Sequence, residues 1–102
     1  DYPGALADYD QAINLNPNDA PAYNNRGNAK FYLKDYRGAL ADYDQAIKLN
    51  PNDAQAYCGR GLARSMLGQE TEALADFQKA VELNPALLEY VPEEYKKRIK
   101  PN

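Results

Sequence analysis

Few residues in this chain have the types that catalysis or metal binding requires. The 102 residues include no His and one Cys, which excludes His general bases, Cys–His nucleophile pairs and His metal sites. Cys58 has no partner for an internal disulfide and is more typical of a small packing residue than of a nucleophile. We therefore expect a protein that is not an enzyme, with no catalytic residue, no cofactor and no metal.

One pair of charged residue types recurs at a fixed distance along the chain. Arg precedes Gly at Arg26 and again at Arg60, and Asp precedes an aromatic residue at Asp8, Asp42 and Asp76. This repetition predicts an Arg–Asp salt bridge beside the contact between two elements, with the Arg stem lying on apolar surface. A row of arginines facing a ligand is the alternative.

These charges repeat because whole segments repeat. Residues 1–20 and 35–54 match at 18 of 20 positions, at an offset of 34 residues. The same offset places the segment 22–30 over 56–64, and a looser third copy covers 73–85. Self-similarity at such a period is typical of repeat proteins in which each unit packs on its neighbours.

Each unit has the pattern of two helices joined by a turn. Apolar residues of the segment 35–50 fall at a spacing of three and four, which predicts an amphipathic helix. Asn50 and Pro51 end it, because Pro lacks the backbone donor and disfavours helix at the residue before it. Asp19 and Asp53 stand where a helix N-cap is expected. The helices that follow are expected over about 20–33 and 54–67.

The period and these residues resemble the tetratricopeptide repeat (TPR) family over residues 1 to about 85. The resemblance implies an all-α fold, an α-solenoid of about two and a half repeats plus a C-terminal capping helix in a single domain. The motif is carried by Tyr23, Gly27, Ala29, then Tyr57, Gly61, Ala63, and by Ala5, Tyr9, Ala12, Pro17 with their copies at offsets of 34. The implied units are 1–19 (second helix of a truncated repeat), 20–53 and 54–87 (full repeats), and 88–102 (capping helix and tail).

The resemblance also implies where a partner binds. The first helices of stacked TPR units line a concave groove that holds a peptide or a partner helix, so a scaffold or adaptor function is expected. The alternative is that these polar residues only solvate an open helix face. The candidate groove residues are Asn24, Asn25, Asn28, Tyr32, Gln55, Cys58, Leu62 and Met66.

A well-known TPR groove clamps the acidic C-terminal tail of chaperones with lysines, arginines and asparagines. Asn25 and Asn28 fall at positions similar to those of the clamp. Asn24, Gln55 and Gly59 stand where its cations are expected. We therefore do not expect this chain to bind chaperone tails.

The two ends of the repeat array lead to further expectations. The first helix has no preceding helix to cover Leu6, Tyr9 and Ile13, which predicts either missing upstream repeats or self-association as a homo-oligomer. At the other end, residues 86–102 leave the repeat pattern. They are expected to form a capping helix whose apolar face includes Val91, Tyr95 and Ile99.

Charge and composition restrict the partners. The net charge is −3, which disfavours a helical-repeat RNA binder because phosphate binding needs a basic stripe. No apolar run is long enough for a membrane span. We expect a protein or peptide partner, no nucleic acid and no membrane, and the single Cys is compatible with a reducing compartment such as the cytoplasm.

Overall fold

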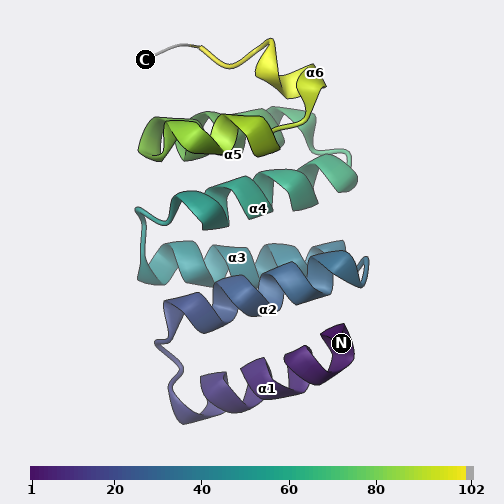
Figure 1. The fold of residues 1–102 in the computed structure, drawn as a ribbon, viewed down its shortest axis with the longest axis vertical. Helices are drawn as coiled ribbons and strands as arrows, with labels where there is room; N and C mark the ends of the chain where they lie inside the picture. The colour runs from purple at the N-terminus through teal and green to yellow at the C-terminus, as the bar shows by residue number, and fades with distance from the viewer. Residues whose placement is uncertain (101–102) are drawn as a thin grey trace.

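The computed structural model describes residues 1–100 as a stack of antiparallel helices, with α1 at one end and the C-terminal segment at the other (Figure 1). No strand occurs in these residues, and no helix among them is both long and apolar enough to cross a membrane. The all-α solenoid is therefore confirmed. Its elements are α1 (Tyr2–Leu15), α2 (Ala20–Tyr32), α3 (Tyr36–Leu49), α4 (Ala54–Met66), α5 (Glu70–Leu83), the 3-10 helix η1 (Pro85–Tyr90) and α6 (Glu93–Lys96).

The helix ends follow from local side-chain chemistry. The Asp19 and Asp53 carboxylates each accept a hydrogen bond, at 3.1 Å, from the backbone N–H three residues later. This satisfies one of the free donors of the first turn, as expected for an N-cap. The second helices of the units, α1, α3 and α5, end at Asn16, Asn50 and Asn84, which adopt extended backbone before a Pro. The repeated Asn-Pro pair therefore sets where each second helix ends.

The core is built from aromatic rings packed on glycines. Tyr43 and Phe77 are fully enclosed side chains, one from α3 and one from α5. A Cβ atom added at Gly61 would lie 2.7 Å from the Phe77 ring, and one added at Gly59 would lie 2.6 Å from the Tyr43 ring. Since real Cβ atoms do not approach so closely, the glycines are required for the helices to reach this separation.

The C-terminal segment covers α5 in a different form from the one expected. Instead of a continuous capping helix, it comprises η1 and the single turn α6, separated by Val91 and Pro92. The Pro92 ring prevents a backbone hydrogen bond at this point. Val91 and Tyr95 are nevertheless buried against the α5 core, and Ile99 packs beside them. The segment therefore covers α5 although its helices are short. Positions 101–102 of the expected tail lie outside the described residues.

Candidate peptide-binding groove

A hollow of about 260 Å³ opens between α2, α4 and η1, on the face formed by the first helices of the repeats. We call it the α2–α4 groove. Four of the candidate residues meet there, with amide groups from α2 and α4 beside a thiol and an aliphatic side chain. The groove is lined by Asn28, Gln55, Cys58, Gly59, Leu62, Leu87 and Tyr90.

Sequence reasoning missed the two groove residues that η1 contributes. Leu87 is buried against the α5 core, whereas Tyr90 is mostly exposed at the rim. Leu87 is the last residue of the unit expected over 54–87, and Tyr90 lies in the segment expected to cap the array, so neither was assigned to the groove. The apolar residues that follow Pro85 were the only available signal. They do not indicate the side of α5 to which the chain turns.

The other four candidates do not line the hollow. Asn25 and Tyr32 of α2 and Met66 of α4 are exposed elsewhere, and the Tyr32 ring stacks on Tyr2 of α1 at a centroid distance of 5.2 Å. Asn24 is buried, with 6% of its surface exposed. No partner among the described residues reaches its Oδ1 atom. A binding role for these four residues stays a prediction.

A buried tyrosine orients one of the groove amides. The Tyr43 hydroxyl donates a hydrogen bond to Asn28 Oδ1, which leaves the N–H groups of that amide as donors toward solvent or a ligand. Burial is the main cause that raises the pKa of Tyr43 above its ordinary value. The hydroxyl therefore keeps its proton, and the donor role, throughout the neutral range.

Burial lowers the reactivity expected of the groove thiol. Cys58 is buried, and this burial raises its pKa above the ordinary value. The thiolate is therefore scarce at neutral pH, and the thiol behaves as a small apolar surface. The chemistry of the groove is that of amide hydrogen bonds around an apolar floor.

The predicted Arg–Asp pairing is confirmed in both full repeats. Arg26 donates from Nε and Nη2 to the two oxygens of buried Asp42, at 2.9 and 2.8 Å. Arg60 makes the same bidentate pair with buried Asp76, at 3.0 and 2.8 Å. The hydrogen bond to Asp42 is the largest influence on Arg26 and raises its pKa. These guanidinium groups hold helices together, and their contacts do not belong to the groove.

Each of these arginines also reaches the helix of the preceding repeat. Arg26 Nη1 lies 2.8 Å from Asp10 of α1, and Arg60 Nη1 lies 3.0 Å from Asp44 of α3. The sequence signal was present, since Asp10 and Asp44 follow the first carboxylates by two residues at the same offset of 34. One Arg therefore joins two successive second helices, which fixes the stacking of repeats.

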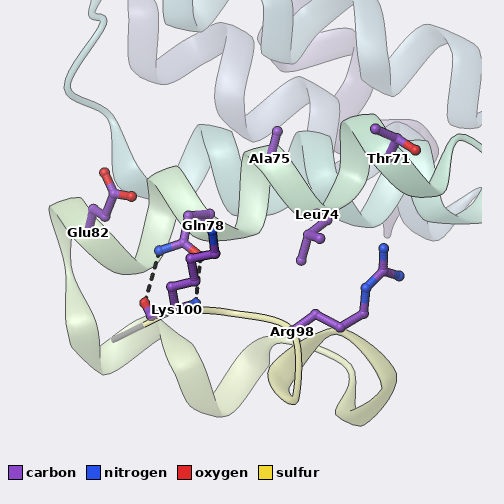
Figure 2. Close-up of a pocket in the computed structure, with 7 residues that line it drawn as sticks. All are labelled: Thr71, Leu74, Ala75, Gln78, Glu82, Arg98 and Lys100. Carbon is purple, nitrogen blue, oxygen red and sulfur yellow. Dashed lines mark hydrogen bonds between the residues drawn. The ribbon is translucent and has the colours of Figure 1, made fainter. Parts of the chain in front are cut away.

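A second hollow, of about 420 Å³, lies between α5 and the C-terminal segment that contains Arg98 and Lys100 (Figure 2). The Gln78 side chain accepts a hydrogen bond from Lys100 N at 2.9 Å and donates one to Lys100 O at 3.1 Å. These two bonds hold the segment across α5. The hollow is lined by Thr71, Leu74, Ala75, Gln78, Glu82, Arg98 and Lys100.

The candidates for self-association lie on α1. Leu6, Tyr9 and Ile13 are half-buried, and α1 contains no buried residue. Their counterparts in α5 include buried Phe77 and Val81. Self-association through these side chains stays a prediction.

Comparison with known proteins agrees with this architecture. The first TPR of Spaghetti (RPAP3), bound to the HSP90 peptide SRMEEVD, is 30% identical with a TM-score of 0.83, over 96% of this chain and 74% of that chain. The Arabidopsis OM64 TPR domain is 32% identical with a TM-score of 0.82, over 96% and 76%. MamA is 25% identical with a TM-score of 0.78, over 82% of this chain and 49% of that one. A search of curated proteins found no match.

The family comparison extends over nearly the whole repeat array. The TPR repeat model matches residues 1–33 and 27–68, and the tetratricopeptide repeat model matches residues 54–87. The matched segments together include all five long helices. The chain belongs to the tetratricopeptide repeat family.

Proposed function

We propose that the chain is a protein-interaction module whose α2–α4 groove binds an extended, uncharged peptide segment of a partner protein. The observation that carries this proposal is the lining of the groove. It combines exposed amides from two successive repeats with an apolar floor, all on one face. Extended peptides present backbone donors and acceptors that amide side chains can pair with.

Two groups of side chains have different roles in this binding mode. Asn28 and Gln55 pair with the peptide backbone, and Tyr43 holds the Asn28 amide in place. Cys58, Leu62 and Leu87 provide a floor for one apolar side chain of the peptide. The amides set the direction of the chain, while the floor selects the side chain.

The charge of the groove argues for an uncharged peptide. No Lys or Arg lines the α2–α4 groove, so the carboxylates of an acidic peptide find no cation there. The first TPR of Spaghetti (RPAP3), a structural neighbour, is bound to the acidic HSP90 peptide SRMEEVD, and we expect this chain to prefer a peptide of different charge. Burying carboxylates in a groove without cations is unfavourable.

An array of heptapeptides that varies the central side chain and the net charge tests this proposal. It includes SRMEEVD and a counterpart in which Glu and Asp are replaced by Gln and Asn. We expect uncharged peptides with a central Val, Leu or Met to bind best, with affinities measured by fluorescence anisotropy. SRMEEVD is expected to bind more weakly than its uncharged counterpart.

Variants then locate the site. Replacing both amides (N28A with Q55A) removes two net hydrogen bonds of about 1 kcal/mol each, so affinity for the best array peptide falls at least about tenfold. Asn52→Ala is the matched control, because it removes an exposed amide outside the groove. Binding that survives the double substitution, a preference for acidic peptides, or no binding on the array contradicts the proposal.

A further inference from the structure

The two amides of the α2–α4 groove differ in the hydrogen bonds that they offer to a peptide. The hydroxyl of the enclosed Tyr43 ring donates to Asn28 Oδ1. The Oδ1 atom therefore points toward the core, and the N–H groups of the amide point toward the groove. Gln55 is exposed, and no hydrogen bond to its side chain is found within residues 1–100. Asn28 thus acts as a donor toward a ligand, whereas Gln55 both donates and accepts.

This asymmetry restricts the peptide residue that faces Asn28. In an extended chain the N–H and C=O groups of one residue point to the same side. The carbonyl of the residue that faces Asn28 accepts from its amide, but the N–H group of that same residue meets only another donor. An unpaired donor in an interface costs free energy. Proline has no N–H group and loses nothing at this position.

The adjacent residue of the peptide faces the other wall of the groove. Successive residues of an extended chain point their side chains to opposite faces. A residue that faces Gln55 keeps its N–H group, because the carbonyl of the Gln55 amide accepts it. Its side chain then points to the apolar floor formed by Cys58, Leu62 and Leu87, while the side chain of the residue facing Asn28 points to the rim.

The rim of the groove presents an aromatic ring. Tyr90 lines the groove from η1 and is 63% exposed. Aromatic rings in grooves are the surfaces on which Pro-containing extended segments dock. Proline also orders the peptide in advance, because it fixes its own φ and favours extended backbone at the residue before it. Less conformational entropy is then lost on binding.

We propose that the α2–α4 groove selects a peptide segment in which an apolar residue is followed by proline. The proline faces Asn28, and its ring lies on Tyr90. The preceding apolar side chain occupies the floor, and the backbone of that residue pairs with Gln55. This inference rests on the proposed function, because it specifies which uncharged peptide the groove prefers.

Three blocked heptapeptides that differ at one position test this preference. The parent is acetyl-GSQLPQG-amide, and its two counterparts have alanine or N-methylalanine in place of proline. N-Methylalanine lacks the N–H group but has no ring. In fluorescence anisotropy competition with the full chain, we expect proline to bind about fivefold or more tightly than alanine, with N-methylalanine between them.

Variants of the groove then separate the two sources of the preference. Asn28→Asp presents an acceptor in place of the donor, so the preference for proline over alanine should disappear or reverse. Gln55→Glu is the matched control, because it makes the same chemical change on the wall where both peptides have an N–H group. It should leave the ratio of the two affinities unchanged. Tyr90→Ala should make proline and N-methylalanine bind equally, whereas Leu88→Ala, on exposed surface of η1, should not.

The outcomes distinguish this preference from the binding function itself. Equal affinity for the proline and alanine peptides, with binding still lost in the double variant N28A with Q55A, overturns the preference and leaves the proposed function intact. A preference that survives Asn28→Asp, or falls equally in Gln55→Glu, also overturns it, because Asn28 would then not be its source. Absence of binding by all three peptides contradicts both proposals.

Discussion

The helices α1 and α5 occupy equivalent positions in their repeats, yet one is exposed and the other is built into the core. Among the 14 residues of α1 none is buried, whereas α5 buries Ala73, Asp76, Phe77, Ala80 and Val81. Leu6, Tyr9 and Ile13 are chemically similar to Leu74, Phe77 and Val81 at the same repeat positions. The difference therefore arises from the neighbours and not from the helix sequence: α5 lies between α4 and the η1–α6 segment.

This comparison shows how a repeat protein distributes its stability. The same side chain contributes little when one face of its helix is open and much when helices pack on both sides. Substitutions at equivalent positions of the two helices should consequently differ in cost by several-fold, although the residues removed are nearly the same.

The largest difference is expected for the aromatic residue of each helix. Phe77→Ala removes a fully enclosed ring packed on Gly61, which should lower the free energy of unfolding by about 3–5 kcal/mol. Tyr9→Ala removes a half-buried ring and should cost about 1 kcal/mol. Urea unfolding followed by circular dichroism measures both, and equal costs would contradict the role assigned to the neighbouring helices.

The next difference concerns the carboxylate before the aromatic residue. Asp76→Ala leaves Arg60 and Arg64 without their buried partner, at a cost of about 2–3 kcal/mol, since Arg60 keeps its contact with Asp44. Asp8→Ala should change stability by less than about 0.5 kcal/mol, because an exposed carboxylate loses no contact.

A salt titration separates the two carboxylate variants further. The Asp8 substitution should remain near neutral at every ionic strength. The cost of Asp76→Ala should persist in high salt, because ions screen a buried pair poorly. A cost that disappears in high salt would mean that the Asp76 pair behaves as a surface ion pair.

The sequence predicts the repeated parts of this structure better than the C-terminal segment, which is not repeated. The helices could be predicted because copies at a period of 34 residues share N-caps such as Asp53 and stops such as Pro51. The Arg26–Asp42 pair could be predicted because both charges recur. The form of the C-terminal segment could not, since no second copy of it exists and Pro92 divides it into two short turns.

The groove also combines residues that could be predicted from the sequence with residues that could not. Asn28 and Leu62 occupy one repeat position on α2 and α4, so the resemblance to TPR proteins implied that both face the groove, and both line it. Leu87 and Tyr90 join them because the chain turns at Pro85 and crosses toward α4, and that direction depends on tertiary packing. Periodicity predicts faces of helices, but it does not predict where an irregular segment crosses them.

A smaller effect is expected at high pH, for the buried tyrosine of α3. Burial raises the pKa of Tyr43, so the unfolded chain loses this proton first as the pH rises above about 10. The stabilisation by the protonated hydroxyl is complete below that pH and is lost above it. Tyr43→Phe should therefore make the alkaline fall in unfolding free energy shallower. Urea unfolding at several pH values up to about 11 measures this, and parallel curves for the variant and the original chain would contradict it.

The smallest effect is expected where α5 holds the segment beyond α6. Gln78 stands at the repeat position of Asp10 and Asp44, the carboxylates that receive an Arg from the following repeat. An amide has both a donor and an acceptor, and Gln78 uses both on the Lys100 backbone. Gln78→Ala should cost at most about 1 kcal/mol, because these bonds are exposed to water.

Hydrogen exchange gives a local measurement of this contact, since the Lys100 N–H donates to Gln78 Oε1. Exchange at Lys100 should become faster in Gln78→Ala, while Gln11→Ala on α1 should leave it unchanged. Gln78→Asp should lie between the wild type and Gln78→Ala, because a carboxylate still accepts from the Lys100 N–H but cannot donate to its carbonyl. If Gln78→Asp instead exchanged as slowly as the wild type, the donor half of the amide would be dispensable. The difference between Gln78 and its Asp counterparts would then have no role in holding the segment on α5.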